Sequence, residues 1–363
     1  MKKLLALFLS LCLLGSIFVG CDKETDNKPE ESTQGPTESS AEGCSTENPY
    51  TTDQPLPESL VTDFQYKIVG GERVFITKYV GNDETVVIPS KIENLPVTVL
   101  SGVEDADYPG VVNEGVFEGS DVKTVVLPDT LITIGGRSFL NCEKLTKVIL
   151  EPVSSLRVIA GKAFANCVAL MGIDLSGTNV YTIDTQAFEG CTALKEIRFC
   201  GAVTEIGARA FYNCVSLQEI ALPKELVKIG KAALGNCASV KRITIPSKLE
   251  LYPQSLDEAV FYAENECALE QIVFEEGREE INGYAFFDLT SNVEIIIPAS
   301  VKKFSPDPFF LHASAKIVFL GDCPEILKKE FYGNPTVSIS YDSNTKGWEN
   351  CAWKGQYTLE PMK

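Results

Sequence analysis

A spaced apolar pattern recurs along the chain between residues 145 and 245. Each copy places large apolar residues at positions i, i+3 and i+5. The copies are Leu145-Val148-Leu150, Leu170-Ile173-Leu175, Leu194-Ile197-Phe199, Leu217-Ile220-Leu222 and Val240-Ile243-Ile245. The alternation at the end of each copy predicts a short strand with one buried face. Proline follows several of these strands and ends them, at Pro128, Pro223, Pro246 and Pro298.

A second block of residues alternates with these strands. In this block an isoleucine is followed five residues later by a phenylalanine or leucine, and then three residues later by a cysteine. The isoleucines are Ile134, Ile159, Ile183, Ile206 and Ile229, which are 25, 24, 23 and 23 residues apart. The other members are Phe139, Phe164, Phe188, Phe211 and Leu234, the small residues Ser138, Ala163, Ala187, Ala210 and Ala233 before them, and Cys142, Cys167, Cys191, Cys214 and Cys237. Asparagine precedes four of the five cysteines. A repeat of this length predicts a solenoid, in which each coil closes its core against its neighbours.

The unit L-x-x-I-x-L-P-x-x-L-x-x-I-G-x-x-A-F-x-x-C resembles the BspA-like class of bacterial leucine-rich repeats, and residues 215–237 show nearly all of it. The resemblance covers about residues 64–363. It implies a β-rich solenoid of leucine-rich-type repeats with short parallel strands, turns and short helices. It also implies an N-terminal entry repeat at residues 64–100 and a closing cap from about residue 335, sealed by Trp348 and Trp353. We expect about nine or ten coils.

Two regions depart from the repeat. Residues 101–115 form an insertion that closing a coil does not require, so they are an alternative binding site. The later copies are degenerate, and the copy around Ile317 and Phe319 is barely recognisable.

The N-terminus has the features of a secretory signal. Lys2 and Lys3 precede an apolar run that is too short for a typical membrane span, and Val19-Gly20-Cys21 ends it. The ending resembles a bacterial lipobox, although Phe18 stands where leucine is more usual. The resemblance implies cleavage of residues 1–20 and a lipid anchor on Cys21 in a bacterial membrane. The alternative is an ordinary cleaved signal followed by an incidental cysteine.

Residues 21–61 are rich in Ser, Thr, Glu and Pro and contain almost no aliphatic residue. Such a segment buries too little apolar surface to offset the entropy of ordering it, so we expect a disordered tether. A plain linker and a glycosylated stalk are the two interpretations of its composition. The folded repeat domain should then comprise residues 62–363.

The chain carries a formal net charge of −18, which disfavours binding to nucleic acid and to anionic lipid surfaces. The expected contact with a membrane is therefore the lipid anchor alone. No C-x-x-C motif or histidine cluster indicates a metal site, and we expect no cofactor.

Catalysis is not expected either. His312, the single histidine, lies at a degenerate junction between coils, and no pair of acidic residues stands out as a glycosidase pair. The five cysteines of the repeat occupy a small apolar position, which favours buried free thiols over disulfides. The states of Cys44, Cys200 and Cys351, which lie outside that register, are left open.

The outward positions of the predicted strands form the candidate binding face. Its central charges are Asp174, Glu196, Arg198 and Arg242. The face has no aromatic residue, which disfavours a glycan ligand, whereas charges mixed with β-branched side chains suit a protein partner. A solvent-exposed sheet face without a binding function fits the pattern equally well. The leading hypothesis is an adhesin-like cell-surface protein that binds a host or neighbouring-cell protein through this face rather than in a cavity. The alternative is an envelope scaffold or accessory lipoprotein of a transport or enzyme complex.

Overall fold

We describe the fold from a computed structural model. The structure describes residues 58–104, 112–150, 154–218, 220–250, 260–262, 269–282, 286–289, 292–307, 309–311, 313–328, 330–331 and 336–362. All of them fall within one compact unit, Asn48–Lys363. The predicted signal peptide, Cys21, most of the predicted tether, Cys44 and His312 lie outside the described residues.

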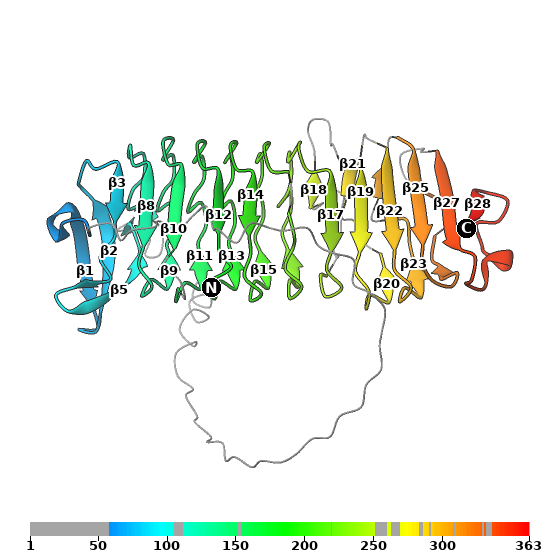
Figure 1. Cartoon of the computed structure of the whole chain (residues 1–363), viewed down its shortest axis with the longest axis horizontal. Coiled ribbons are helices and arrows are strands. Elements are labelled where there is room, and N and C mark those ends of the chain that lie inside the picture. The colour runs from blue at the N-terminus through cyan, green and yellow to red at the C-terminus, as the bar shows by residue number, and fades with distance from the viewer. Residues whose placement is uncertain are drawn as a thin grey trace, which may run out of the picture. The chain divides into compact units, whose positions relative to one another are not determined.

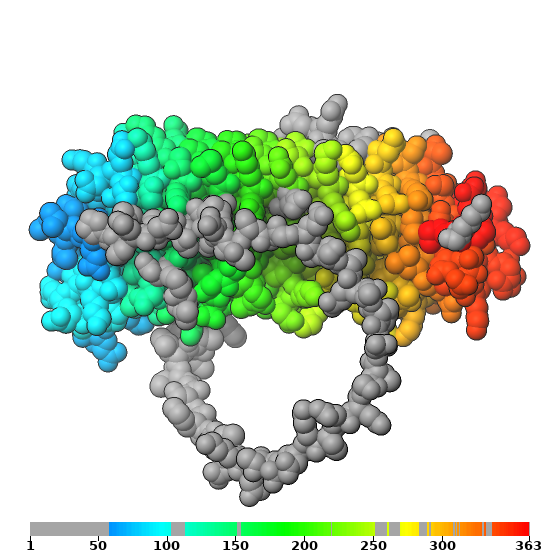
Figure 2. All heavy atoms as spheres, in the orientation of Figure 1, coloured from blue at the N-terminus to red at the C-terminus, as the bar shows by residue number. Residues whose placement is uncertain are grey.

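The described residues form a β-solenoid of about 11 turns, stacked in the order of the sequence (Figures 1 and 2). One strand of each coil lies on the side that we call the outward face. These strands are β3 (Thr85–Val87), β8 (Thr124–Leu127), β10 (Lys147–Leu150), β12 (Gly172–Asp174), β14 (Glu196–Arg198), β17 (Arg242–Ile245), β19 (Gln271–Phe274), β22 (Val293–Ile297), β25 (Ala315–Phe319), β27 (Val337–Asp342) and β28 (Thr358–Met362). They pair in parallel within three groups, β3-β8-β10, β12-β14 and β17 to β28. Their inward side chains, such as Val148, Ile173 and Ile295, are completely buried.

A second short strand follows the turn after each outward strand. In the first half these strands are β5 (Leu95–Leu100), β9 (Thr133–Ile134), β11 (Val158–Ile159), β13 (Thr182–Ile183), β15 (Glu205–Ile206) and β16 (Lys228–Ile229). In the second half they are β20 (Glu280–Ile281), β23 (Lys303–Phe304) and β26 (Glu325–Ile326). The repeat isoleucines of the sequence pattern point inward from these strands, and Ile134, Ile159 and Ile183 are completely buried.

The third side of each coil is a tight turn in the first half of the stack. In the five cysteine-containing copies, two residues of the turn have a positive φ, one two positions before the buried phenylalanine or leucine and one two positions after it. The second of these is Asn141, Asn166, Gly190, Asn213 or Asn236. Asparagine and glycine adopt this left-handed conformation most readily, which explains the asparagine before the cysteine. In the second half, strands β18 (Phe261–Tyr262), β21 (Phe286–Leu289) and β24 (Phe309–Leu311) occupy this side.

A column of stacked phenylalanine rings forms the core of the first half. Neighbouring rings of Phe117, Phe139, Phe164, Phe188 and Phe211 have centroids 4.9–5.3 Å apart and planes 4–9° apart. The prediction that Phe164, Phe188 and Phe211 are almost fully buried is confirmed, because each has no exposed surface.

The repeat cysteines line this column as free thiols, and each donates a hydrogen bond to a backbone carbonyl of the preceding coil. The Sγ–O distances are 2.9–3.2 Å, and the acceptors of Cys142, Cys167, Cys191, Cys214 and Cys237 are Phe117, Phe139, Phe164, Phe188 and Phe211. The repeat thiols therefore act as hydrogen-bond donors as well as small apolar groups.

Distinct structures flank the stack at its two ends. At the N-terminal end, η1 (Val61–Asp63) leads into the antiparallel hairpin of β1 (Phe64–Val69) and β2 (Arg73–Tyr79), and β4 (Lys91–Ile92) pairs with β5. At the C-terminal end, η3 (Trp348–Asn350) connects β27 with β28, and the indoles of Trp348 and Trp353 are buried.

Three details differ from the sequence-based expectation. The coils number about 11 rather than nine or ten. Helix is almost absent, and the expected short helices are tight turns with two 3-10 segments among the described residues. The insertion at 101–115 contributes a short antiparallel pair, β6 (Val103–Glu104) and β7 (Val112–Glu114), and residues 105–111 lie outside the described part. No helix among the described residues has the length and apolarity needed to span a bilayer.

Candidate interaction face

The parallel register of the outward strands places equivalent side chains beside one another. Lys147 is the pairing partner of Thr124, Arg198 that of Asp174, and Gln271 that of Arg242. These pairs follow the outward columns expected from the sequence. The face therefore presents two ordered columns of side chains along the stack.

The four charges expected at the centre of this face divide into two groups. Asp174 lies on β12 beside Arg198 on β14, and Arg198 forms an ion pair with Glu196 two residues before it. Arg242 begins β17, which belongs to the next group of strands, and the coil of Ile220 lies between. The structure thus brings three of the four charges together, with Arg242 exposed further along the same face.

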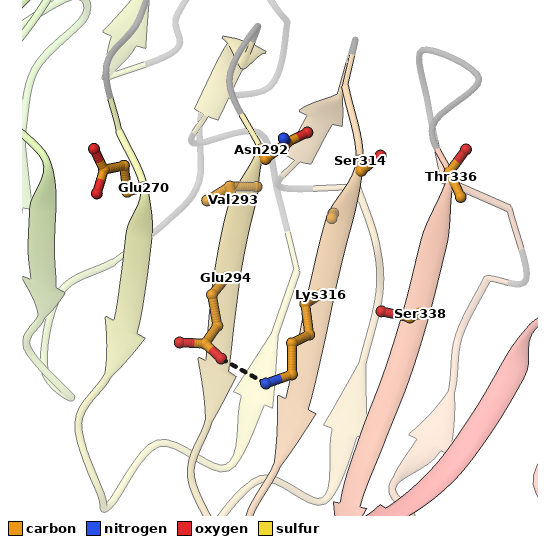
Figure 3. A pocket seen from close by; sticks show the side chains of 9 residues that line it. Glu270, Asn292, Val293, Glu294, Ser314, Lys316, Thr336 and Ser338 are labelled. Carbon is orange, nitrogen blue, oxygen red and sulfur yellow. Dashed lines mark hydrogen bonds and ion pairs between the residues drawn. The ribbon is translucent and has the colours of Figure 1, made fainter.

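A hollow of about 310 Å³ opens on the outward face in the C-terminal half (Figure 3). It lies at the N-terminal ends of β19, β22, β25 and β27. Its lining is Glu270, Asn292, Val293, Glu294, Ser314, Ala315, Lys316, Thr336 and Ser338. Most of these side chains end in a carboxylate, an amide, a hydroxyl or an ammonium group, so the hollow can exchange hydrogen bonds with a polar ligand.

Glu294 is the centre of the polar contacts in this hollow. Its carboxylate accepts hydrogen bonds from Lys316 Nζ at 2.9 Å and from Gln271 Nε2 at 2.7 Å. The hydrogen bond from Lys316, supported by that from Gln271, lowers the pKa of the Glu294 carboxyl. Lys241 Nζ similarly donates to Glu270 at 2.9 Å. Glu294 is therefore a stable anion flanked by donors, a pattern typical of surfaces that make polar contacts.

Strand alternation assigns Gln271 and Glu294 to outward positions, but the sequence pattern did not lead to Lys316, Ser314 or Ser338. Those residues lie on or beside β25 and β27, where the repeat pattern is degenerate. The available signal was Ile317-x-Phe319, which marks the inward positions of β25 and therefore assigns Lys316 and Val318 to the outward side.

A second concavity of about 510 Å³ lies along β13, β15 and β16, away from the outward face. Glu205, Lys228 and Lys231 are among its lining residues. Both hollows are open to the surface, so the expectation that a partner binds the outward face rather than an enclosed cavity stays a prediction.

Neither a metal site nor a reactive repeat thiol is evident among the described residues. They contain no group of three or more His, Cys, Asp or Glu side chains placed to hold a metal ion. Burial raises the pKa of the Cys142 thiol to about 11 and that of the Cys191 thiol to about 12, so these repeat thiols are neutral and poor nucleophiles at neutral pH.

The model of the BspA type leucine rich repeat region matches the chain in six copies, over residues 111–233, 157–261 and 236–360. These matches span more than half of the chain. The chain belongs to the BspA-type leucine-rich-repeat family. The match begins at residue 111, so the entry region with β1, β2 and β5 lies before it.

Solved structures of other leucine-rich-repeat proteins resemble this BspA-type chain. The T. pallidum leucine rich repeat protein TpLRR is 24% identical, with 60% of this chain and 86% of that chain covered and a TM-score of 0.38. A leucine-rich repeat protein from Bacteroides ovatus is 19% identical, with 86% and 77% covered and a TM-score of 0.42. A leucine rich cell surface protein from Faecalibacterium prausnitzii is 19% identical, with 71% and 92% covered and a TM-score of 0.30. No curated protein sequence matches the chain.

Proposed function

We propose that this protein is a non-catalytic, lipid-anchored protein of the bacterial cell surface whose outward face binds another protein in an adhesin-like manner. The observation that carries the proposal is the hollow on the outward face, where Glu294, Lys316 and Ser338 from three successive coils present polar groups in register. The family and the printed description of the F. prausnitzii relative as a cell surface protein support an extracytoplasmic location.

The composition of the outward face favours a protein partner. The outward face carries charged groups such as Arg198 and Glu294 together with apolar ones such as Val273 and Ile296, and such mixtures are typical of protein interfaces. Lys316 and Arg242 are exposed and can pair with acidic groups of a partner. A partner that lies across several coils would contact the same column position in each.

A photo-cross-linking experiment tests the proposed face. A photoreactive amino acid is introduced at the exposed positions Arg242 and Ser338, and at the exposed control positions Lys228 and Lys303 on other sides of the coils. Irradiation of intact cells in contact with their neighbours should join the same protein to the two outward positions only. Products from Lys228 alone would assign binding to the second concavity and overturn the proposal.

The anchoring part of the proposal rests on the N-terminal sequence. We propose residues 1–20 as a cleaved signal peptide, residues 21–61 as a tether and residues 62–363 as the repeat domain, with a diacylglyceryl group on Cys21. Two acyl chains hold a protein on a membrane stably, whereas one chain binds marginally. Cys21→Ala should therefore move the full chain from the detergent phase to the aqueous phase in a Triton X-114 partition, and an unchanged partition would refute the anchor.

The envelope-scaffold alternative differs in where the repeat domain lies. Added protease or antibody should reach the repeat domain on intact cells if it is a surface binder. Protection on intact cells that disappears when the envelope is opened would instead support a scaffold or accessory lipoprotein of an envelope complex.

A further inference from the structure

Two thiols lie side by side at the C-terminal end of the solenoid. Cys323 follows β25, and Cys351 directly follows η3 in the segment between β27 and β28 (Figure 1). The two thiols lie close enough to interact directly. Cys351 is buried and Cys323 is partly exposed, so solvent reaches the pair from the Cys323 side.

Contacts that do not involve sulfur hold the two segments together. The Cys323 N–H donates to the Lys346 carbonyl at 2.8 Å, and the Lys346 N–H donates to the Asp322 carboxylate at 2.8 Å. The Trp348 indole N–H lies 3.3 Å from the Gly321 carbonyl. The backbone therefore places the two sulfurs together before any covalent bond exists.

Gly347 provides the space beside Cys323. Its φ is +87°, and a Cβ at this position would lie 3.3 Å from the Cβ of Cys323. A glycine lets the chain turn here and approach Cys323 closely.

The remaining described thiols have different partners. The five repeat thiols donate to phenylalanine carbonyls. Cys200, which lies outside that register, donates to the Val180 carbonyl at 3.1 Å. In the C-terminal pair, the neighbouring Cys323 thiol lowers the pKa of the Cys351 thiol. Cys351 therefore ionises more readily than an ordinary thiol, and the thiolate is the form that reacts in thiol–disulfide exchange.

We propose that Cys323 and Cys351 form a disulfide that fastens the closing segment to the last regular coil. The oxidant is a disulfide, either that of an extracytoplasmic thiol oxidoreductase or a small-molecule disulfide such as oxidised glutathione. One protein thiolate attacks the oxidant, forms a mixed disulfide and displaces one thiolate. The other protein thiol then loses its proton, attacks the protein sulfur of the mixed disulfide and displaces the second thiolate, so two electrons pass to the oxidant.

The expected consequence concerns the exposed end of the stack. End coils of a solenoid contact one neighbour only and therefore open first. A bond from Cys323 to Cys351 links residues on either side of β27, so β27 and η3 could no longer separate from the stack independently.

Tryptic peptide mapping tests the pairing directly. Cleavage at the lysines releases Cys323 in residues 317–328 and Cys351 in residues 347–354, with one cysteine in each peptide. The full chain is incubated with oxidised glutathione, alkylated under denaturing conditions, and digested without reductant. We expect the two peptides joined by a disulfide, and the repeat cysteines alkylated. Glutathione on either cysteine alone, pairing with another cysteine, or complete alkylation of both would overturn the proposal.

Hydrogen exchange of the same full chain tests the fastening. Exchange in η3 and β28 should be at least about tenfold slower in the oxidised protein than in the reduced protein. Cys323→Ser treated with the same oxidant is the matched control and should show no slowing. The comparison of oxidised with reduced wild type remains informative if the variant folds poorly. Equal exchange in the two wild-type states would show that a disulfide fastens nothing.

Discussion

At the residue scale, Phe164 shows how one side chain connects three coils. Its ring stacks between Phe139 and Phe188 at centroid distances of 5.0 and 5.1 Å. Its N–H donates to the Ala187 carbonyl at 2.7 Å, and its own carbonyl accepts the thiol of Cys191. Ring stacking, backbone pairing and a thiol hydrogen bond therefore all act at a single repeat position.

Phe164→Ala should destabilise the repeat domain by about 3–5 kcal/mol, because it removes a fully buried ring and leaves a cavity. Chemical denaturation followed by circular dichroism measures the change. Met171→Ala is the matched control, because Met171 is a large apolar residue that is 52% exposed, and it should change stability little. Equal effects of the two substitutions would show that the column is not the main core.

The repeat thiols should make the protein sensitive to alkali. Burial raises the pKa of Cys191 to about 12, from an ordinary value of 9.0. Its contribution to stability is complete below pH 9, because the thiol is then neutral in both states. Above pH 9 the unfolded thiol ionises first, so stability should fall as the pH rises from 9 towards 12.

Denaturation midpoints measured from pH 7 to pH 11 check this dependence, and Cys191→Ala should reduce its slope. Iodoacetamide at pH 8 should label the repeat cysteines after unfolding and not before. Rapid labelling of Cys142, Cys167, Cys191 or Cys214 in the folded protein would contradict the assignment. Repeat cysteines that stay unlabelled after denaturation without reductant would instead indicate disulfides.

At the scale of the element, the tight turn is the part of the coil that constrains the sequence most. Each turn has two left-handed residues around a buried small residue, as with Ala232 and Asn236 on either side of Ala233. The Ala233 carbonyl accepts the N–H of Phe211 at 2.8 Å, so the small side chain allows neighbouring turns to approach. Ala232 has a φ of +49° although it is neither asparagine nor glycine, the residues that adopt this conformation most readily.

Ala232→Gly should change stability by less than about 0.5 kcal/mol, because relief of the positive φ offsets the loss of a buried methyl group and the greater freedom of the unfolded chain. Ala233→Gly is the adjacent control without a positive φ, and it should destabilise by about 1 kcal/mol through lost burial and greater freedom of the unfolded chain. Thermal denaturation of the two variants should show the larger loss for Ala233→Gly. Equal losses would count against strain at Ala232.

At the scale of the whole molecule, packing and surface charge have separate functions. A continuous apolar core runs through the coils, whereas the charged groups lie outside it and many pair between neighbouring coils, as Lys302 does with Glu279 and Lys316 with Glu294. Exposed ion pairs of this kind contribute little to stability because water screens them. Surface charges can therefore be changed without unfolding the stack.

Arg198→Glu combined with Arg242→Glu should leave the melting temperature nearly unchanged and weaken binding to the partner identified by cross-linking. The Arg198–Glu196 ion pair is exposed enough for its loss to cost little. Lys248→Glu combined with Lys302→Glu gives the same change in net charge away from the outward face, and it should preserve binding. Salt titration of the complex measures the difference.

The alternative binding site is the insertion at residues 101–115. If the reversal at Arg198 and Arg242 leaves binding intact and deletion of residues 101–115 abolishes it, the insertion and not the outward face is the site.

The sequence by itself determined the repeat, the buried columns and the outward columns. These features are local, because strand alternation assigns each side chain to one face and the 23–25-residue spacing repeats that assignment in every coil. The left-handed turn residue was not predicted, although glycine at Gly190 replaces the asparagine of the other copies and a positive φ favours both.

Only the tertiary structure decided which residues of different coils meet. Lys316 joins Glu294 in the hollow, and Cys323 meets Cys351, through the hydrogen-bonded register between neighbouring coils. That register depends on the length and course of the intervening turns, which vary where the repeat is degenerate. The pattern within one copy contains no information about how neighbouring coils align with each other. Contacts between coils in the C-terminal half could therefore not be derived from the sequence.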